Sequence, residues 1–419
     1  MRLRPLYLLS GLVLCFFSAC GRKAGAELPP LLYTVSSRAV SVGCLPRGAA
    51  DLSFVCDSLH LFRRLDYGPF KHAPMMFSQE YGGSLVDVLS IEIGRSVGDT
   101  SARVSALAQR ASELGLKWSL AEGFAPSGHR AALLLSRSET ALREAVGHIA
   151  TGSSILDASG FREAASRMDA SVPSLLLRTD AAARWLPARL PDGPFTRRSL
   201  AAFLGRFCRW LCIAFPSEDE RLLYPLGDDP AFYAPVLASL PPAKSRLEPL
   251  LPEGVSFVAC LALDDWRAFY ERRRDWLDAR SLLQRHDAAC RQLASASGLR
   301  PRDWAAALDV KEIARLRWDG HEVLLIRPGK GKVDEKMHDY SGAGFAGEIF
   351  GSIFVLEDET CCAGRSGYLV IGSRDDVASL LEALCATGQV RWPARCRFAL
   401  MLPGLLLSDR DDGIGCRLY

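Results

Sequence analysis

The chain has 419 residues, of which 49% are hydrophobic and 24% are charged, and its formal net charge is only +3. That length predicts two or three domains with cores of ordinary size. The small net charge argues against nucleic acid as a partner, because no polybasic run supplements it. The densest basic cluster, Arg272 to Arg274, is flanked by Glu271 and Asp275 and is typical of a solvated helix face.

The N-terminus has the pattern of an export signal. Two arginines stand among the first four residues, an apolar run covers 6–17, and the small residues Ser18 and Ala19 precede Cys20. The run is shorter than the roughly 20 residues that span a bilayer, which favours a cleaved signal over a permanent membrane helix. A plain secretory signal cut near Ala19 is the alternative in which Cys20 has no role.

The stretch "FSAC", Phe17 to Cys20, resembles the bacterial lipobox, with Phe17 in place of the usual Leu. The resemblance implies that 1–19 is removed and that Cys20 becomes the lipidated first residue, which anchors the protein to a membrane. Polar residues 20–30 would then form a tether. In Gram-negative lipoproteins, Asp after the cysteine retains the protein at the inner membrane. Gly21 stands there, so the resemblance implies the outer membrane.

The chain has 13 cysteines, one inside the predicted signal and one at Cys20, which leaves 11. An odd number excludes complete intramolecular pairing, and no C-x-x-C occurs that would predict a zinc site. Cys208 and Cys212 lie in an apolar segment and are expected to be buried. Cys361 and Cys362 stand at a predicted turn, where the sequence leaves an exposed thiol pair open.

Three pairs of similar segments recur in the same order and predict an internal duplication. The first pair begins at Leu45 ("LPRG") and Leu251 ("LPEG"). The second pair ends at Gly152 and Gly388, and both of its members have a strand, an acidic helix start and Thr-Gly. The third pair begins at Val172 ("VPSLLLRTD") and Leu402 ("LPGLLLSDR"). Their offsets imply an insertion of about 30 residues in the second copy, between the first and second landmarks.

Apolar patterning predicts the elements of each copy. Strands are expected at 52–58, 84–93, 116–124 and 130–137 in the first copy, and at 347–358 and 366–375 in the second. Helices are expected at 100–115, ending on Gly115, and at 138–152, with Ser138 as N-cap. Asp319-Gly320 predicts a hairpin. A buried helix is expected over 196–216, followed by a Pro-rich connection.

These elements predict an α+β fold in which each copy is a mostly antiparallel sheet with helices packed on one face. The predicted parts are a signal peptide at 1–19, a tether at 20–30, a first copy at 31–195, a helix and Pro-rich connection at 196–250 and a second copy at 251–419.

Gly342, Gly344 and Gly347 match G-x-G-x-x-G, the fingerprint of dinucleotide-binding folds. The fingerprint requires a preceding strand and a helix that begins within it. Here the preceding segment is charged and the following "EIFGSIFVLED" alternates like a strand. The motif therefore predicts a loop that leads into a strand, without a nucleotide.

Other motifs of enzymes and metal sites are absent from the sequence. It lacks G-x-S-x-G, H-E-x-x-H and a Walker loop. His148 and His321 have no acidic or cysteine partner at ligand spacing. "DRDDG" at Asp409 to Gly413 is too short for a calcium loop. The sequence therefore predicts no catalytic, cofactor-binding or metal residues, and Cys20 is the single assigned site.

The lipobox and the duplicated units resemble a group of uncharacterised bacterial envelope lipoproteins with a duplicated domain of unknown function, over residues 31–410. We therefore expect a lipid-anchored envelope protein that acts by binding or scaffolding and is not an enzyme. Its expected partners are the membrane, through Cys20, and an envelope protein. The alternatives are an envelope hydrolase with a non-locally assembled site, and a ligand-binding lipoprotein with a cleft between the copies.

Overall fold

The computed structural model describes residues 28–418, except 45–55, 69, 71, 82–83, 97–101, 125–129, 167–172, 190–200, 203–204, 216–219, 227–228, 384–391, 403–404 and 411–412. The predicted signal peptide and Cys20 lie outside the described residues. No helix among those described is both long and apolar enough to cross a membrane.

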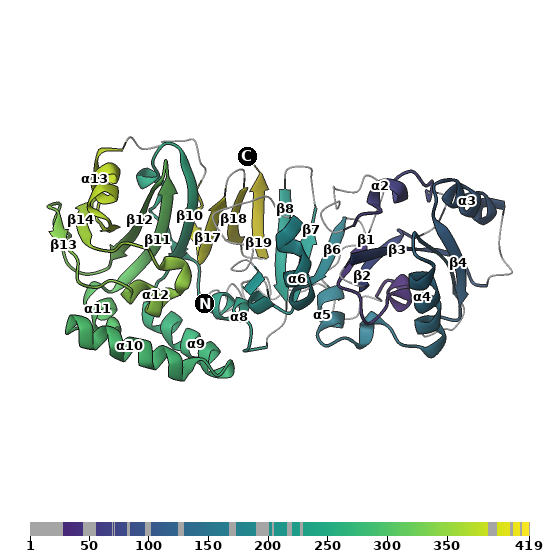
Figure 1. Cartoon of the computed structure of the whole chain (residues 1–419), viewed down its shortest axis with the longest axis horizontal. Coiled ribbons are helices and arrows are strands. Elements are labelled where there is room, and N and C mark those ends of the chain that lie inside the picture. The colour runs from purple at the N-terminus through teal and green to yellow at the C-terminus, as the bar shows by residue number, and fades with distance from the viewer. Residues whose placement is uncertain are drawn as a thin grey trace, which may run out of the picture.

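Two antiparallel half-sheets lie end to end along the molecule (Figure 1). The first half has the strand order β4 (Lys117–Glu122), β5 (Ala131–Ser136), β3 (Ser84–Gly94), β2 (Met75–Tyr81), β1 (Ser41–Cys44), β6 (Ser174–Arg178), β7 (Trp210–Ala214), β8 (Glu220–Leu226). The second has β14 (Cys361–Arg365), β15 (Tyr368–Gly372), β12 (His321–Pro328), β11 (Val310–Trp318), β10 (Val255–Ala262), β17 (Phe398–Leu402), β18 (Leu405–Arg410), β19 (Gly413–Leu418), with β13 (His338–Asp339) beside β14.

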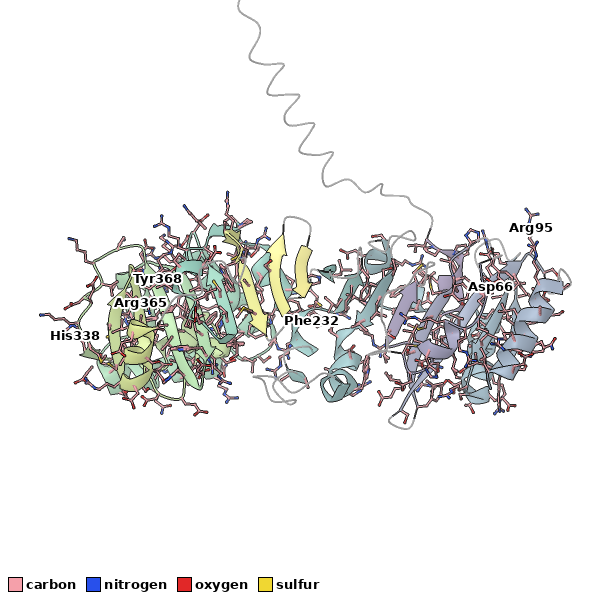
Figure 2. All side chains as sticks on the ribbon, turned by 90° about the horizontal axis from the view of Figure 1, so that it is seen from above. Asp66, Arg95, Phe232, His338, Arg365 and Tyr368 are labelled. Carbon is pink, nitrogen blue, oxygen red and sulfur yellow. The ribbon has the colours of Figure 1, made fainter. Side chains whose placement is uncertain are left out.

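The halves meet through their edge strands. β8 and β19 pair antiparallel, with Leu223 opposite Ile414, so one hydrogen-bonded ladder runs through both halves. Seen from above, Asp66 and Arg95 lie at one end of the elongated molecule and His338 and Tyr368 lie at the other (Figure 2).

The strand order is the same in both halves, which confirms an α+β fold made of two related antiparallel copies. The best sequence landmark is also confirmed over its described part, and its end at Gly388 lies outside the described residues. β5 and the following helix α4 (Glu139–Thr151) occupy the same place as β15 and the following helix α13 (Arg374–Glu382).

The other two landmarks are misaligned by one strand. The counterpart of β10 is β1, which ends before Leu45, and the counterpart of β6 is β17, whereas the segment from Leu402 leads into β18. Short apolar strands resemble one another, so a local match does not fix register. The strand predicted at 52–58 lies mainly outside the described residues, and Cys56 to Ser58 lead into helix α2 (Leu59–Phe62) instead.

Most of the extra chain of the second half lies between β10 and β11, and a smaller part lies between β12 and β14. Residues 263–309 form α9 (Trp266–Ala279), α10 (Leu283–Ser297) and α11 (Pro301–Leu308), where 45–74 of the first half contain α2. The insertion is therefore shorter than the 30 residues predicted, because the first landmark was misaligned.

Helices cover both faces of the sheet, and the prediction of one covered face is wrong. On β5, Leu133 and Leu135 pack in the cluster of α3 (Ala102–Glu113), whereas Ala132 and Leu134 pack in the cluster of α4. All six residues of β5 are buried. A strand buried on both sides has a continuous apolar run instead of alternation. In the second half α9, α11 and α12 (Phe345–Phe350) share the cluster of α3, and α13 covers the opposite face.

The remaining helices are short or border the sheet. They are η1 (Pro30–Thr34), η3 (Ile155–Asp157), α5 (Phe161–Ser166), α6 (Thr179–Arg189), α8 (Ala234–Ala238), η4 (Glu248–Leu250) and η5 (Ser352–Phe354), with a small β9–β16 ladder (Ala243–Lys244, Arg395–Cys396).

Several local predictions are confirmed. Gly115 follows α3 with φ 75°, and the Ser138 hydroxyl caps α4 by accepting the Ala141 N–H at 3.2 Å. Asp319 and Gly320 have φ 44° and 86° and close the β11–β12 hairpin.

One long prediction is wrong in its second part, whereas the described residues 201–202 and 205–207 are helical, as predicted. Trp210 to Ala214, inside the helix predicted over 196–216, form strand β7, and the predicted Pro-rich connection contains strand β8. A short, wholly apolar run cannot be assigned to strand or helix by periodicity. Cys208 and Cys212 are buried, as predicted.

Candidate functional site

The glycine motif lies at a helix start, which corrects the prediction of a loop leading into a strand. Residues of the strand expected at 347–358 form α12 and η5 instead, and Gly344, with φ 79°, is the N-cap of α12. The helix has only six residues, and the element before it is the two-residue β13. The strand that a dinucleotide fingerprint requires is therefore missing among the described residues.

At the start of α12, the backbone N–H of Gly344 has its hydrogen-bond partner within the protein. The Gly344 N–H donates to Glu359 Oε2 at 2.8 Å, and the Leu356 N–H donates to Glu359 Oε1 at 3.1 Å. Gly347 has a packing role, because a Cβ there would lie 2.2 Å from the Val355 Cγ2. The glycines thus serve the backbone and the packing of α12.

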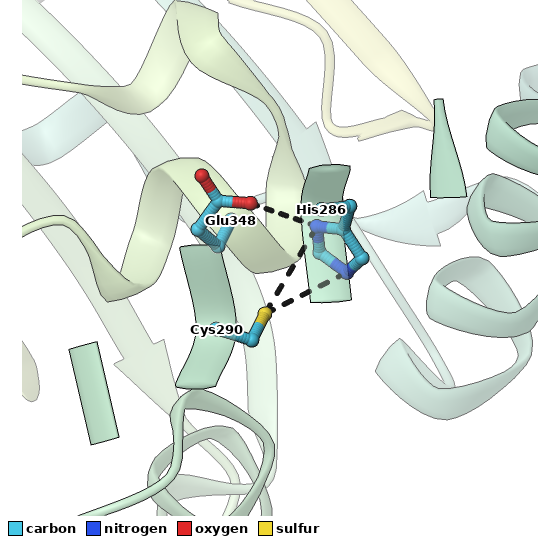
Figure 3. A group of neighbouring side chains, drawn as sticks. All are labelled: His286, Cys290 and Glu348. Atoms are coloured by element: carbon cyan, nitrogen blue, oxygen red, sulfur yellow. Dashed lines mark hydrogen bonds and ion pairs between the residues drawn. The ribbon is translucent and has the colours of Figure 1, made fainter. Parts of the chain in front are cut away.

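A cluster of His286, Cys290 and Glu348 is the described group with the ligand types of a metal site (Figure 3). His286 and Cys290 lie one turn apart on α10, and Glu348 comes from α12. His286 Nδ1 lies 2.7 Å from Glu348 Oε2, and His286 Nε2 lies 3.1 Å from the hydroxyl of Tyr270 on α9. Cys290 Sγ lies 3.7 Å from Nε2 and 4.0 Å from Nδ1.

The imidazole of His286 is a buried contact between α10 and the rest of the fold. His286 is the buried residue of that helix, and its ring lies 5.9 Å from the Tyr270 ring. We assign the tautomer in which Nδ1–H donates to the Glu348 carboxylate and Nε2 accepts from the Tyr270 hydroxyl, which makes both contacts hydrogen bonds.

Arginines surround the cluster. Buried Arg273 donates to the main-chain carbonyl of Glu348, and burial lowers the pKa of its guanidinium. Arg274 pairs with Asp287 at 2.7 Å, and that hydrogen bond lowers the pKa of the Asp287 carboxyl. Asp287 compensates the charge of Arg274, and Arg273 remains as the cation nearest the Glu348 main chain.

The geometry does not make Cys290 an activated nucleophile. Burial, followed by the negative charges of Glu348 and Asp287, raises the pKa of its thiol to about 11. The sulfur is almost equally distant from both ring nitrogens, so it lies over the face of His286 and not along the in-plane lone pair of either nitrogen. A catalytic cysteine needs a lowered pKa and a base in line with the thiol.

A second candidate is a polar pocket of about 390 Å³, the first-half pocket. It is lined by Ser37, Arg38, Val40, Gln79, Glu80, Tyr81, Glu144, Arg178 and Arg184. Two consecutive hydrogen bonds join residues of its lining. Gln79 Nε2 donates to the Tyr81 oxygen, and the Tyr81 hydroxyl donates to Glu144 Oε2. Burial, with this bond to Glu144, raises the pKa of Tyr81, so its phenol stays protonated.

Two buried polar atoms of the first-half pocket have no hydrogen-bond partner, the acceptor Gln79 Oε1 and the donor Arg178 Nε. Gln79 is 2% exposed. Arg178 Nε lies 3.2 Å from Asp180 Oδ1 as an ion pair, without the geometry of a hydrogen bond. Arg184 pairs with Glu80 at 3.0 Å.

A pocket of about 320 Å³ in the second half borders a different kind of network. There the fully buried carboxylate of Glu312 accepts from the Tyr368 hydroxyl, Arg327 Nε and the Arg246 N–H. Because these bonds satisfy the carboxylate, the network holds the fold together and offers little to a ligand.

The histidines singled out in the sequence have partners that only the fold provides. His148 Nδ1 lies 3.0 Å from the Ser153 hydroxyl, and His321 Nδ1 lies 2.8 Å from Asp376 Oδ1 on α13. Cys361 and Cys362 lie within β14 and not at a turn, and Cys361 is buried.

The structure also shows where two further sequence features lie. "DRDDG" falls between β18 and β19, partly outside the described residues. The four-residue spacing of His286 and Cys290 is the local feature of this cluster that the sequence contains, and it is too common on helices to predict a site.

Comparison of the chain with protein families, curated proteins and solved structures found no match. The resemblance to envelope lipoproteins therefore stays a prediction, and the described geometry is the ground for a functional proposal.

Proposed function

We propose that the protein is a lipid-anchored cell-envelope protein that works by binding, and that the first-half pocket takes a small polar ligand. The observation that supports binding there is that two buried atoms in one pocket, Gln79 Oε1 and Arg178 Nε, have no hydrogen-bond partner, although Arg178 Nε has an ion pair with Asp180. An unpaired buried polar atom costs about 1–3 kcal/mol, so a ligand that donates to Gln79 Oε1 gains that difference.

The two atoms differ in what they require of the ligand. Gln79 Oε1 accepts, so the ligand must donate to it, and the carboxylate of Glu144 favours a positively charged donor. Glu80, in contrast, is already paired with Arg184. Arg178 Nε donates, and Arg38 adds a second guanidinium to the lining, so the other end of the ligand should be an anion. A molecule with an ammonium and a carboxylate group, such as an amino acid or short peptide, has both.

One further observation supports binding over the runner-up, an envelope hydrolase. Cys290 with His286, the nucleophile–base pair within the His286–Cys290–Glu348 cluster, has a thiol with a raised pKa and poor alignment. The two described pockets lie one in each half, and the binding proposal concerns the one in the first half.

The test is calorimetric titration of the purified full chain with free amino acids, dipeptides, simple carboxylates and simple amines. We expect binding only of ligands with both charges, and at least tenfold weaker binding to Arg178→Met. Arg110→Met is the matched control, because Arg110 lies on the exposed side of α3, paired with Glu113 at 2.8 Å. No binding at millimolar concentration, or equal loss in both variants, would contradict the proposal.

A further inference from the structure

We propose that His286, Cys290 and Glu348 form a binding site for a divalent transition-type cation such as Zn²⁺. The cluster offers one sulfur, one nitrogen and one carboxylate oxygen, and these ligand atoms lie within 4.8 Å of one another. Thiolate and imidazole favour Zn²⁺ and similar ions, whereas Mg²⁺ and Ca²⁺ prefer oxygen ligands throughout.

The distances between the three ligand atoms are close to those of an occupied metal site but do not yet match them. Bonds of about 2.0–2.3 Å in a tetrahedron place the ligand atoms roughly 3.3–3.6 Å apart. The 2.7 Å contact between His286 and Glu348 is shorter than this, because it is a hydrogen bond, and the 3.7 and 4.0 Å contacts of Cys290 are longer. The metal replaces the shared proton of the His286–Glu348 pair and separates those two atoms.

The sulfur must move for the site to close, because Sγ lies over the ring face and a metal binds in the plane of the imidazole. Rotation of Cys290 between staggered χ1 positions carries its sulfur about 3 Å. Cys290 is only partly buried and α10 is otherwise largely exposed, so this rotation does not disturb the core.

The protons balance with one released for each ion bound. The imidazole proton moves from Nδ1 to Nε2, so Nδ1 gains the free lone pair, and Nε2–H then donates to the Tyr270 oxygen. Such an outer hydrogen bond is the usual support of a metal-binding histidine. The Cys290 thiol ionises and its proton goes to solvent. One thiolate and one carboxylate then neutralise the divalent ion.

The place of the cluster in the fold agrees with an added function. His286, Cys290 and Tyr270 lie on α9 and α10, the helices by which the second half exceeds the first. Tyr270 also packs in the core beside the sheet, whereas Cys290 is only partly buried. A metal would join α10 to α12, which the His286–Glu348 contact already connects (Figure 3).

The test is titration of the full chain, kept reduced, with Co²⁺ as a spectroscopic substitute for Zn²⁺. We expect one equivalent of Co²⁺ to bind. The complex should show a sulfur-to-cobalt charge-transfer band in the near ultraviolet and the intense visible bands of a four-coordinate site. Cys290→Ser should lose the charge-transfer band. His286→Gln and Glu348→Gln should each weaken Co²⁺ at least tenfold, and Tyr270→Phe about 10- to 100-fold through the lost outer bond.

Controls separate this site from the other thiols. Cys362→Ser, which removes a partly buried thiol on β14, should leave the band unchanged. Zinc calorimetry in buffers of different ionisation enthalpy should report one proton released per ion. Circular dichroism of Cys290→Ser checks that the variant is folded. Absence of a charge-transfer band in the wild type, or a band that persists in folded Cys290→Ser, would overturn the proposal.

Discussion

Glu359 accepts the N–H of Gly344 at 2.8 Å and so occupies the helix start that the glycine fingerprint would otherwise present to a phosphate. The carboxylate comes from the same chain, 15 residues on, and a second N–H, that of Leu356, holds its other oxygen. A motif that is typical of nucleotide binding is thus explained by local structure.

Gly344→Ala should therefore destabilise the fold without affecting any nucleotide. Gly344 has φ 79°, a conformation that costs an alanine about 1 kcal/mol or more. Urea unfolding of the wild type and the variant measures this loss. Calorimetry with ATP, NAD and FAD should show no binding to either protein. Micromolar affinity in the wild type that the substitution abolishes would restore the nucleotide interpretation.

A much larger loss is expected for Glu312→Ala. Glu312 is fully buried, and its removal leaves Arg327 and the Tyr368 hydroxyl without their acceptor. Breaking a buried charged pair costs about 3–5 kcal/mol. Denaturant unfolding measures it, with Glu382→Ala, an exposed residue of α13, as the control that should change little. Equal small losses in the two variants would show that the network contributes nothing to stability.

How far the sequence predicts this structure depends on whether a signal is local. α4 could be read from Ser138 at its start and Gly152 at its end, because a cap is a contact between near neighbours. The Asp319-Gly320 hairpin could be read for the same reason. These signals need no knowledge of the tertiary fold.

The errors occur in short apolar segments. β7 is an apolar run of five residues between β6 and β8, and only its strand partners make it a strand. The segment of α12 is predicted to alternate, but its buried Phe345, Ile349 and Phe350 have helical spacing. Its N-cap is Gly344 and its C-cap is Gly351, with φ 116°. Tertiary context overrides periodicity in β7, whereas in α12 the predicted period itself is wrong.

The candidate sites could not be predicted because their parts are distant in sequence. Glu348 is 62 residues from His286, and the first-half pocket combines Gln79, Glu144 and Arg178 from three elements. The four-residue spacing of His286 and Cys290 was the only local signal. Without a third ligand in reach, that spacing is common on helices and indicates nothing.

The raised pKa of Cys290 predicts a specific pH dependence. Its thiol has a pKa of about 11 in the folded protein against a reference of 9.0, because of burial and the nearby charges of Glu348 and Asp287. A raised folded pKa contributes stability that is fully present below about pH 9 and is lost as the pH rises to about 11. Unfolding curves from pH 8 to 11 should therefore fall less steeply for Cys290→Ser than for the wild type.

Alkylation provides an independent measure of the same thiol. Peptide mapping after brief treatment with iodoacetamide should show Cys290 reacting slowly at pH 8 and steadily faster towards pH 11, because only the thiolate reacts. Fast labelling at pH 7 would mean that the thiol is activated, and would favour the hydrolase alternative over binding.

The membrane anchor is the remaining prediction, and it concerns a residue outside the described structure. If Cys20 is lipidated, Cys20→Ala should abolish incorporation of a fatty-acid probe and release the protein from the membrane fraction, because the substitution removes the thiol that would carry the lipid. Cys15→Ala, five residues earlier and inside the predicted signal, is the matched control and should keep both the label and the membrane location. Labelling that persists in Cys20→Ala, or is lost equally in Cys15→Ala, would remove the lipoprotein proposal and leave the plain secretory signal in its place.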